Sequence, residues 1–294
     1  MLTRRDFLGR TAAGCLTARL ASRVHALEIP LAFQLHAVRG RAAADLPGTL
    51  SSIAAMGYGE VELVSFRGYA SAAPRDGFGP LAPLAPTAIR EIIADANLRA
   101  TSAHFKFDEL QGATFADRVQ WAQGVGLQYM TVADLPVRAT VPEWEHLFEL
   151  LNTIGERVRA EGMQLGLHTQ NDLWRSIDGL SVMERLLAAV DAQNCRIQLD
   201  LSTTQSMQVD PVGFLRRRAA RCFSVHLRDA PTPATPGGYV FSVPLGEGVL
   251  DLPGILAAAR SGGITNFVVE MQTQPPADPF DALRRSALYI RGLP

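Results

Sequence analysis

Four residues of types that commonly bind metals stand at or near the ends of short apolar segments in the second half of the chain. They are His168, Asp200, His226 and Glu270. Imidazole nitrogens and carboxylate oxygens together suit Mn²⁺, Co²⁺, Zn²⁺ or Mg²⁺. A single strand-end histidine is more often a buried residue with a satisfied hydrogen bond, but four ligand types at four successive segment ends rarely coincide by chance. The pattern therefore predicts a divalent-metal site made by these four side chains.

Other polar residues also stand where apolar segments end, and we expect them to line a substrate pocket around the metal. They are Gln34, His36, Glu62, His104 and Arg228, and Glu247 of the long loop after the seventh predicted strand is expected to join them. A polar residue at the end of a buried strand either caps the core or faces a reaction cavity. For Glu62, an ion pair with a loop arginine is an equally good interpretation. Arg228 would bring a permanent cation to the cavity, where a phosphate or carboxylate could pair with it.

The elements that must position these residues form a regular series. From Ile29 onward, short segments rich in Val, Ile and Leu alternate with longer segments of helical periodicity, which is typical of repeated βα units and a parallel sheet. Eight strands are predicted, over residues 31–36, 60–64, 99–104, 129–133, 164–168, 196–200, 223–227 and 266–270. The clearest helices are predicted over 142–160 and 210–221, each with a proline in its first turn.

This series favours an α/β fold of the (β/α)8 TIM barrel type over an open doubly wound sheet. Gly57, Gly126, Gly162 and Gly263 each stand between a helical segment and the next strand, where a left-handed helix cap is needed. An open nucleotide-binding sheet would carry a glycine-rich phosphate turn after its first strand, and residues 34–40 contain none. In a barrel, the carboxyl ends of the strands form the active face, so the polar residues named above would meet at one mouth.

The first 26 residues differ from the rest, because they contain five arginines and a single acidic residue. The stretch Thr3-Arg4-Arg5-Asp6-Phe7-Leu8 has the order of a twin-arginine export signal, and Val24-His25-Ala26 suits a cleavage site with small residues. A basic helix docked on the barrel, or a lipoprotein signal ending at Cys15, are the alternatives. We therefore predict an export signal over 1–26, a single barrel domain over 27–294, and a periplasmic or secreted protein.

Charge and hydropathy narrow the classes of partner. Without the first 26 residues the formal charge falls from −1 to −5, which argues against nucleic acid as a partner. No apolar run reaches the eighteen residues of a membrane helix, so we expect no membrane attachment after signal removal. Cys195 and Cys222 precede apolar stretches without metal-type spacing and are expected to be buried thiols. Assembly into a homo-oligomer is left open.

Five stretches of the chain also resemble a known group of enzymes. They are Phe33-Gln34-Leu35-His36-Ala37-Val38-Arg39, Met56-Gly57-Tyr58-Gly59-Glu60-Val61-Glu62-Leu63, Gly166-Leu167-His168, Ser224-Val225-His226-Leu227-Arg228-Asp229 and Pro244-Leu245-Gly246-Glu247-Gly248. In these stretches the chain resembles the xylose isomerase-like barrels, the sugar phosphate isomerase/epimerase group that also includes inosose dehydratases and endonuclease IV. The resemblance covers about the whole chain after residue 26. Its motifs are specific for the superfamily, but they do not indicate a particular substrate.

The resemblance implies a divalent-metal-dependent isomerase or epimerase that removes a proton next to the carbonyl of a keto-sugar. It implies that Asp200, His226 and Glu270 are metal ligands, while His168 stands where many epimerases have a glutamate. Glu270 would then be the base, with His168 as a second ligand and catalytic residue. Because only one of the usual two glutamates is present, a 1,2-isomerisation or a β-elimination of water or an alkoxide is easier to support than a symmetric epimerisation. A substrate without phosphate is favoured.

Three other functions are weighed against this one. A Schiff-base aldolase needs a lysine in the cavity, and Lys106 is the only lysine of the chain. An endonuclease of the group would need more histidines than the six present and is disfavoured by the negative charge. A non-catalytic sugar-binding barrel would explain the replacement of the usual glutamate by His168. A bound metal together with proton exchange into a keto-sugar would exclude this last alternative.

Overall fold

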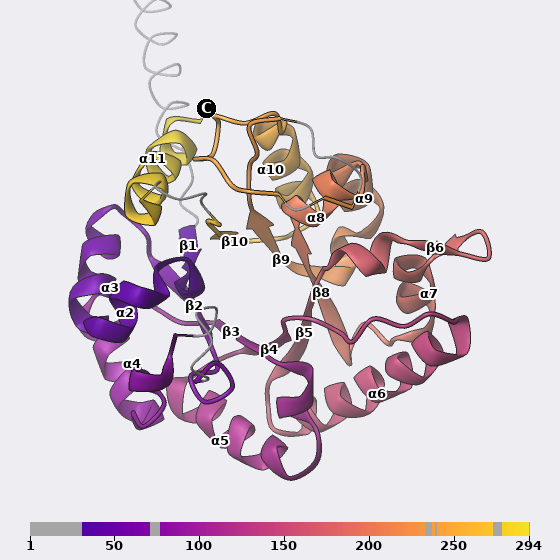
Figure 1. The fold of residues 1–294 in the computed structure, drawn as a ribbon, viewed down its shortest axis with the longest axis horizontal. Helices are drawn as coiled ribbons and strands as arrows, with labels where there is room; N and C mark the ends of the chain where they lie inside the picture. The colour runs from indigo at the N-terminus through magenta and orange to yellow at the C-terminus, as the bar shows by residue number, and fades with distance from the viewer. Residues whose placement is uncertain (1–30, 71–76, 233–236, 239, 273–277, 294) are drawn as a thin grey trace, which may run out of the picture.

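Eight parallel strands close into a barrel in the part of the chain that the structure describes (Figure 1). The structure is a computed structural model and describes residues 31–70, 77–232, 237–238, 240–272 and 278–293. The strands are β1 (Leu31–Gln34), β2 (Glu60–Val64), β3 (Ser102–Phe105), β4 (Tyr129–Val132), β5 (Gln164–His168), β8 (Cys195–Asp200), β9 (Cys222–Leu227) and β10 (Asn266–Val269). They follow one another in sequence order, and β10 pairs with β1 to close the barrel. The predicted (β/α)8 TIM barrel is confirmed.

Helices form an outer ring around the strands, as Figure 1 shows. They are α2 (Arg39–Ala44), α3 (Leu46–Ala55), α4 (Pro86–Asp95), α5 (Phe115–Val125), α6 (Val141–Ala160), α7 (Val182–Ala189), α8 (Leu201–Ser206), α9 (Pro211–Arg218), α10 (Leu252–Ser261) and α11 (Pro279–Gly292). A short antiparallel hairpin of β6 (Ser176–Ile177) and β7 (Leu180–Ser181) lies outside the barrel sheet. The buried apolar side chains between strands and helices, among them Phe33, Leu63 and Leu199, form the core.

The predicted strands are confirmed, with differences of up to three residues at their ends. β1 is shorter than predicted because a 3-10 helix, η1 (Leu35–Val38), begins at once, and the Gln34 side chain accepts a hydrogen bond from the backbone N–H of His36 at 3.0 Å. The second predicted helix ends as α-helix at Arg218 and continues as the 3-10 turn η6 (Ala219–Arg221). The predicted left-handed caps are also found, with φ of +93° at Gly126 and +80° at Gly162.

The lumen of the barrel contains polar side chains at the level where the strands end. Glu62 of β2 contacts Gln34 of β1, Ser102 of β3, Gln198 of β8 and His226 of β9. One side chain can reach residues of strands on opposite sides of the barrel only if it points into the lumen. The interior of this barrel is therefore polar near its mouth, whereas the layer between strands and helices is apolar.

The loop after β9 is held by a buried carboxylate. Asp229 is 0% exposed, and its two oxygens accept four backbone N–H groups. Gly246 and Gly248 donate to Oδ2 at 3.0 Å each, while Ala230 and Leu250 donate to Oδ1 at 3.0 and 3.2 Å. Carboxylate oxygens are acceptors only, so this arrangement satisfies all four donors at once. The loop that carries the Gly246-Glu247-Gly248 motif is thus folded around one side chain.

We expect Asp229→Asn to lower the free energy of unfolding by about 2–4 kcal/mol. The amide nitrogen of asparagine is a donor, and in either orientation it would face two of the four backbone N–H groups. Urea unfolding measures the loss. Asp251→Asn is the matched control, because Asp251 caps α10 by accepting the N–H of Gly254 at an exposed position, where asparagine serves equally well. Equal losses in both variants would contradict this account of Asp229.

None of the helices in the described part of the chain is both long enough and apolar enough to span a membrane. The predicted export signal over 1–26 lies outside the described residues. Cleavage of this segment and a periplasmic or secreted location therefore stay predictions.

Candidate metal centre

The four predicted metal ligands converge at the carboxyl ends of neighbouring strands. His168 ends β5, Asp200 ends β8, His226 lies in β9, and Glu270 follows β10. His168 Nε2 lies 3.2 Å from Asp200 Oδ2, and His226 Nδ1 lies 2.8 Å from Glu270 Oε2. Two ligands of one ion lie at about such separations, because bonds of about 2.1 Å to a metal bring adjacent donor atoms to roughly 3 Å.

The donor atoms form two overlapping sets. In one set, atoms of His168, Asp200 and Glu270 all lie within 4.8 Å of one another, and in the other the same holds for His104, His168 and His226. His168 belongs to both, and His226 reaches the first set through its contact with Glu270. The first set mixes nitrogen and oxygen donors, which suits Mn²⁺, Co²⁺, Zn²⁺ or Mg²⁺, whereas the second contains nitrogen only, which suits Zn²⁺.

Glu62 lies beneath the predicted ligands and is saturated with donors. It is 1% exposed. Its Oε1 lies 2.7 Å from His226 Nε2, 2.9 Å from Gln34 Nε2 and 3.1 Å from His104 Nε2. Its Oε2 accepts Ser102 Oγ and Gln198 Nε2. Among the described residues its charged partners are histidines rather than a loop arginine, and its lone pairs are used within the protein.

Gln198 connects Glu62 and His104 to the predicted metal ligand His168. Its side chain is 0% exposed, and its amide oxygen lies 2.7 Å from His104 Nε2 and 3.0 Å from His168 Nδ1. Its amide nitrogen donates to Glu62 Oε2 at 2.7 Å. Gln198 therefore contacts one predicted ligand and stands two residues before another, Asp200, on the same strand.

Arg228 is turned toward the predicted metal ligand Asp200. Its residue is 5% exposed, and Nη1 donates to Asp200 Oδ2 at 3.1 Å. The other terminal nitrogen donates to the carbonyl of Val240 at 3.1 Å and to Gln272 Oε1 at 3.0 Å. Gln272 in turn donates to Glu270 at 3.4 Å. The guanidinium thus orients Asp200 directly and Glu270 through Gln272, and these contacts occupy donors that a substrate anion would need.

Electrostatics favour a cation at this centre. Burial opposes ionisation of Glu62, but His104 and His226 outweigh it and hold the pKa of this carboxyl well below its usual range. Burial is likewise outweighed by Arg228 at Asp200, whose pKa is depressed, and at Glu270, whose pKa falls to about 2. Three carboxylates are therefore ionised around one lumen.

The pKa of His226 is shifted in the opposite direction, because its neighbours are carboxylates. Burial opposes its protonation, yet Glu62 and Glu270 raise the pKa of this imidazole to about 10. The ring is held between two carboxylates, and Glu270 is one of the oxygen donors of the mixed set. Such a concentration of anionic donors fits a divalent metal.

The remaining predicted pocket residues differ in position. Gln34 and His104 belong to the buried network described above. His36 lies in η1 at the rim, with its ring 6.1 Å from that of Tyr69 and 6.2 Å from that of Phe78. Glu247 is at the surface, in an ion pair with Arg285 of α11. Roles in substrate binding for these residues stay predictions, and Glu247 is not part of the cluster around the metal ligands.

The lysine considered for a Schiff base lies beside this region. The ammonium of Lys106 lies over the ring of Tyr69, 5.0 Å from its centre. This cation–π contact gives the ammonium an aromatic partner and adds no support for the aldolase.

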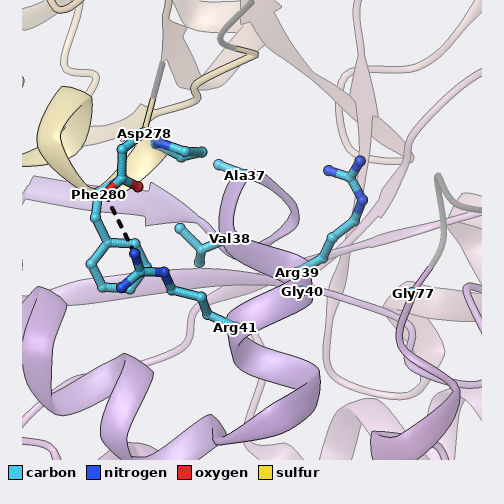
Figure 2. Close-up of a pocket in the computed structure, with 9 residues that line it drawn as sticks. Ala37, Val38, Arg39, Gly40, Arg41, Gly77, Asp278 and Phe280 are labelled. Atoms are coloured by element: carbon cyan, nitrogen blue, oxygen red, sulfur yellow. Dashed lines mark hydrogen bonds and ion pairs between the residues drawn. The ribbon is translucent and has the colours of Figure 1, made fainter. Parts of the chain in front are cut away.

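A depression of about 340 Å³ lies beside the mouth, lined by residues that follow β1, β2 and β10. Figure 2 shows Arg41 reaching Asp278, with Nη2 and Oδ2 3.4 Å apart, and its guanidinium lies 4.3 Å from the centre of the Phe280 ring. Arg39 extends away from this pair in the same view. The lining residues include none of the four predicted ligands, so the depression adjoins the candidate centre without being part of it.

Sequence reasoning missed Gln198, Ser102 and Gln272. The signal for Gln198 was the alternation of a strand, since a residue two positions before Asp200 points to the same side. Ser102 similarly stands two residues before His104 on β3. For Gln272, which follows Glu270 beyond the strand end, no periodic signal exists.

The sequence matches one family model and is similar to curated proteins. A family model described as xylose isomerase-like TIM barrel matches residues 50–293. An inosose dehydratase from Lacticaseibacillus casei is 23% identical in an alignment of 180 positions that covers 56% of this chain and 59% of that protein. The aligned region thus spans little more than half the length of this curated relative.

Solved structures show the same fold at low sequence identity. A sugar phosphate isomerase/epimerase from Parabacteroides distasonis ATCC 8503 has a TM-score of 0.75 and 19% identity, covering 92% of this chain and 96% of its own. A xylose isomerase-like TIM barrel protein from Mycobacterium smegmatis, in complex with magnesium, has a TM-score of 0.63 and 15% identity over 90% of this chain and 96% of its own.

Proposed function

The chain belongs to the xylose isomerase-like TIM barrel family, and from this premise we propose that it is a divalent-metal-dependent sugar isomerase or epimerase. It would remove a proton next to the carbonyl of a keto-sugar. The observation that carries the proposal is the convergence of His168, Asp200 and Glu270 donor atoms within 4.8 Å, with His226 against Glu270. The magnesium bound by the Mycobacterium smegmatis structure supports a metal in this family.

The donor set fits such an ion. His168 and His226 would supply nitrogen, and Asp200 and Glu270 would supply oxygen, which suits Mn²⁺, Co²⁺, Zn²⁺ or Mg²⁺. When bound, a divalent ion would stabilise the negative charge that develops on the carbonyl oxygen as the neighbouring C–H bond is broken. The supporting observation is charge: Asp200 and Glu270 are both ionised, and a carboxylate oxygen of each lies within 4.8 Å of the other.

Side chains of this protein would remove the proton and keep the predicted ligands in place. Glu270, whose depressed pKa keeps it ionised, would take the proton at a carboxylate oxygen. Arg228 would hold Asp200 and, through Gln272, keep the Glu270 carboxylate in one orientation. His168 would act as a ligand that exchanges no proton with the substrate. Only one carboxylate base would then serve the reaction, which favours isomerisation between adjacent carbons.

The substrate we propose is an unphosphorylated sugar or keto-glycoside. Arg228 is the cation nearest the ligands, and its terminal nitrogens donate to Asp200, Val240 and Gln272. A phosphate would have to compete with these partners. A neutral carbohydrate needs only hydrogen-bonding groups at the mouth, and His36 at the rim is a candidate for that contact.

A dehydratase is the second candidate, and the curated relative named inosose dehydratase favours it. The first step would be the same proton removal by Glu270. Loss of water or an alkoxide from the next carbon would follow instead of proton return, and this outcome needs no second base on the opposite face. The replacement of a glutamate by His168 suits elimination for that reason.

Metal content tests the proposal directly. We expect about one divalent ion per chain in the purified full-length protein, measured by plasma mass spectrometry after reconstitution. His226→Ala should lose it, because a ligand and its link to Glu62 and Glu270 are removed together. His146→Ala is the matched control, since His146 is 70% exposed on α6. Equal metal in both variants would reject His226 as a ligand, and none in the unmodified protein would favour a sugar-binding barrel without catalysis.

A further inference from the structure

We propose that Thr169 is a positioning residue, whose hydroxyl group holds the predicted ligand Asp200 against the strand end that carries His168. The proposal rests on the metal-dependent function proposed above, because its main effect is on metal binding. Thr169 directly follows His168 at the end of β5, and its side chain reaches the backbone of Asp200 at the end of β8. It is 0% exposed and would act through these two residues rather than on the substrate.

The Thr169 hydroxyl takes the position of a main-chain acceptor where the pairing of β5 with β8 ends. The backbone N–H of Thr169 donates to the carbonyl of Gln198 at 3.0 Å, one residue beyond the last residue of β5. The N–H of Asp200, two residues further along β8, donates to Thr169 Oγ1 at 2.9 Å. Asp200 is 1% exposed, so its N–H would be buried and unpaired without this hydroxyl, which is costly.

A second threonine completes the attachment from the other side of Asp200. Thr203 Oγ1, on α8, lies 2.9 Å from the carbonyl oxygen of Asp200, and because that oxygen can only accept, Thr203 donates. Thr203 also lies 3.2 Å from Thr169 Oγ1, and since its one hydroxyl hydrogen is already used, Thr169 is the donor of this pair. The indole of Trp174 donates to the same Thr203 oxygen at 3.2 Å. Both backbone groups of Asp200 are thus bound by one connected cluster.

The backbone position of Asp200 determines where its carboxylate lies. Oδ1 accepts the N–H of Ser202 at 2.6 Å, and Oδ2 accepts Nη1 of Arg228 at 3.1 Å. Oδ2 is also the atom 3.2 Å from His168 Nε2, and the two donor atoms must keep such a separation to share one ion. Because Thr169 adjoins His168 and binds Asp200, its hydroxyl sets the spacing between these two predicted ligands.

Cobalt binding by the full-length chain tests the proposal. In Thr169→Val, which keeps the branched shape but removes the hydroxyl, we expect Co²⁺ affinity in chelator competition to fall by about 10- to 100-fold. The visible absorption of bound Co²⁺, which depends on the geometry of its ligands, should change as well. Thr169→Ser restores a hydroxyl and should recover both. Thr131→Val is the matched control, because Thr131 is 0% exposed on β4 and its hydroxyl has no hydrogen-bond partner among the described residues.

A folded Thr169→Val with the affinity and the Co²⁺ spectrum of the unsubstituted chain would overturn the proposal. Losses in Thr169→Ser as large as those in Thr169→Val would overturn it too, because the hydroxyl would then not be their cause. Losses of equal size in Thr131→Val would have the same meaning. A loss confined to Thr169→Val and accompanied by a changed spectrum supports the proposal, since a general loss of stability would not alter the spectrum of the metal that remains bound.

Amide hydrogen exchange of the metal-free full chain, followed by NMR, separates this proposal from the proposed function. We expect the Asp200 N–H to be protected in the unsubstituted chain and in Thr169→Ser, and to exchange about tenfold faster in Thr169→Val. If this is found but the protein binds no Mn²⁺, Co²⁺, Zn²⁺ or Mg²⁺, the proposed function fails and the positioning of Asp200 by Thr169 stands. An unprotected Asp200 N–H in the unsubstituted chain would overturn the proposal even if Thr169→Val does not fold.

Discussion

Replacing Glu270 with glutamine should lower proton exchange between solvent and a keto-sugar by about 10²- to 10⁴-fold, the range expected for loss of a general base. The amide of glutamine cannot accept a proton at neutral pH, but it has the size of the carboxylic acid and keeps one oxygen toward His226. The loss of one anionic ligand should also weaken metal binding, so the comparison is made at metal concentrations that saturate the variant.

Deuterium incorporation from D₂O, followed by NMR, measures this exchange without knowledge of the product. Suitable probes are unphosphorylated ketopentoses, ketohexoses and an inosose. Glu149→Gln serves as the control, because that glutamate is 79% exposed on α6. Exchange that persists undiminished in metal-saturated Glu270→Gln would show that another group is the base. The products then divide the candidates: a deuterated isomer indicates an isomerase, and a dehydrated, unsaturated ketone indicates a dehydratase.

The barrel could be predicted from the sequence because its signals are local. Segments such as residues 60–64 and 164–168 are predicted to the residue, since a short apolar segment between a helix cap and a loop has few alternatives. β1 ends two residues before its predicted end, and β3 begins three residues after its predicted start. At β1, the Gln34 side chain caps η1 by accepting the His36 N–H, and this contact ends the strand two residues before the apolar pattern does.

The sequence predicts which side chains meet at the mouth of the barrel, but not the contacts that hold them there. His168, Asp200, His226 and Glu270 are recognisable because strand ends in a barrel share one face. The role of Gln198 depends on pairing between β5 and β8, which places it opposite His168, and on an irregularity between Ile197 and Gln198 in the pairing with β9. Which residues lie opposite one another on two strands depends on the tertiary fold, so the sequence of one strand does not indicate it. The Glu247–Arg285 pair likewise joins a loop to α11, and no spacing in the sequence indicates it.

Glu62 holds together the buried polar side chains inside the barrel, and its position explains why a polar lumen is stable here. These side chains are Gln34, Ser102, His104, Gln198 and His226. Five donor groups from β1, β3, β8 and β9 surround its two oxygens, including the imidazoles of His104 and His226. Buried polar groups are tolerated when every member of the network is satisfied, and this carboxylate satisfies most of them at once. Among the described contacts of this ionised group, one is with a predicted metal ligand, His226, and the others are with residues that surround the ligands.

We expect Glu62→Gln to lower the free energy of unfolding of the metal-free protein by about 3–5 kcal/mol, the range for breaking a buried ion pair from one side. The amide nitrogen would face either the three donors at Oε1 or the two at Oε2, and the His226 imidazolium would lose a neighbouring charge in a site where its own side chain is 0% exposed. Urea unfolding of the metal-free chain measures this loss apart from any change in metal binding.

Glu60→Gln provides the control for that measurement, because it makes the same change two residues earlier on β2. Glu60 is buried but pairs with Arg99, whose side chain is 68% exposed, and burial raises the pKa of the Glu60 carboxyl, so the loss of its charge should cost less stability than the loss at Glu62. A loss in Glu62→Gln no larger than in Glu60→Gln would mean that His104 and His226 are held by other contacts. A much larger loss, together with more than one protonation state of His226 in ¹H–¹⁵N NMR spectra of its side chain, would show that the charge of Glu62 holds the histidines of the site in place.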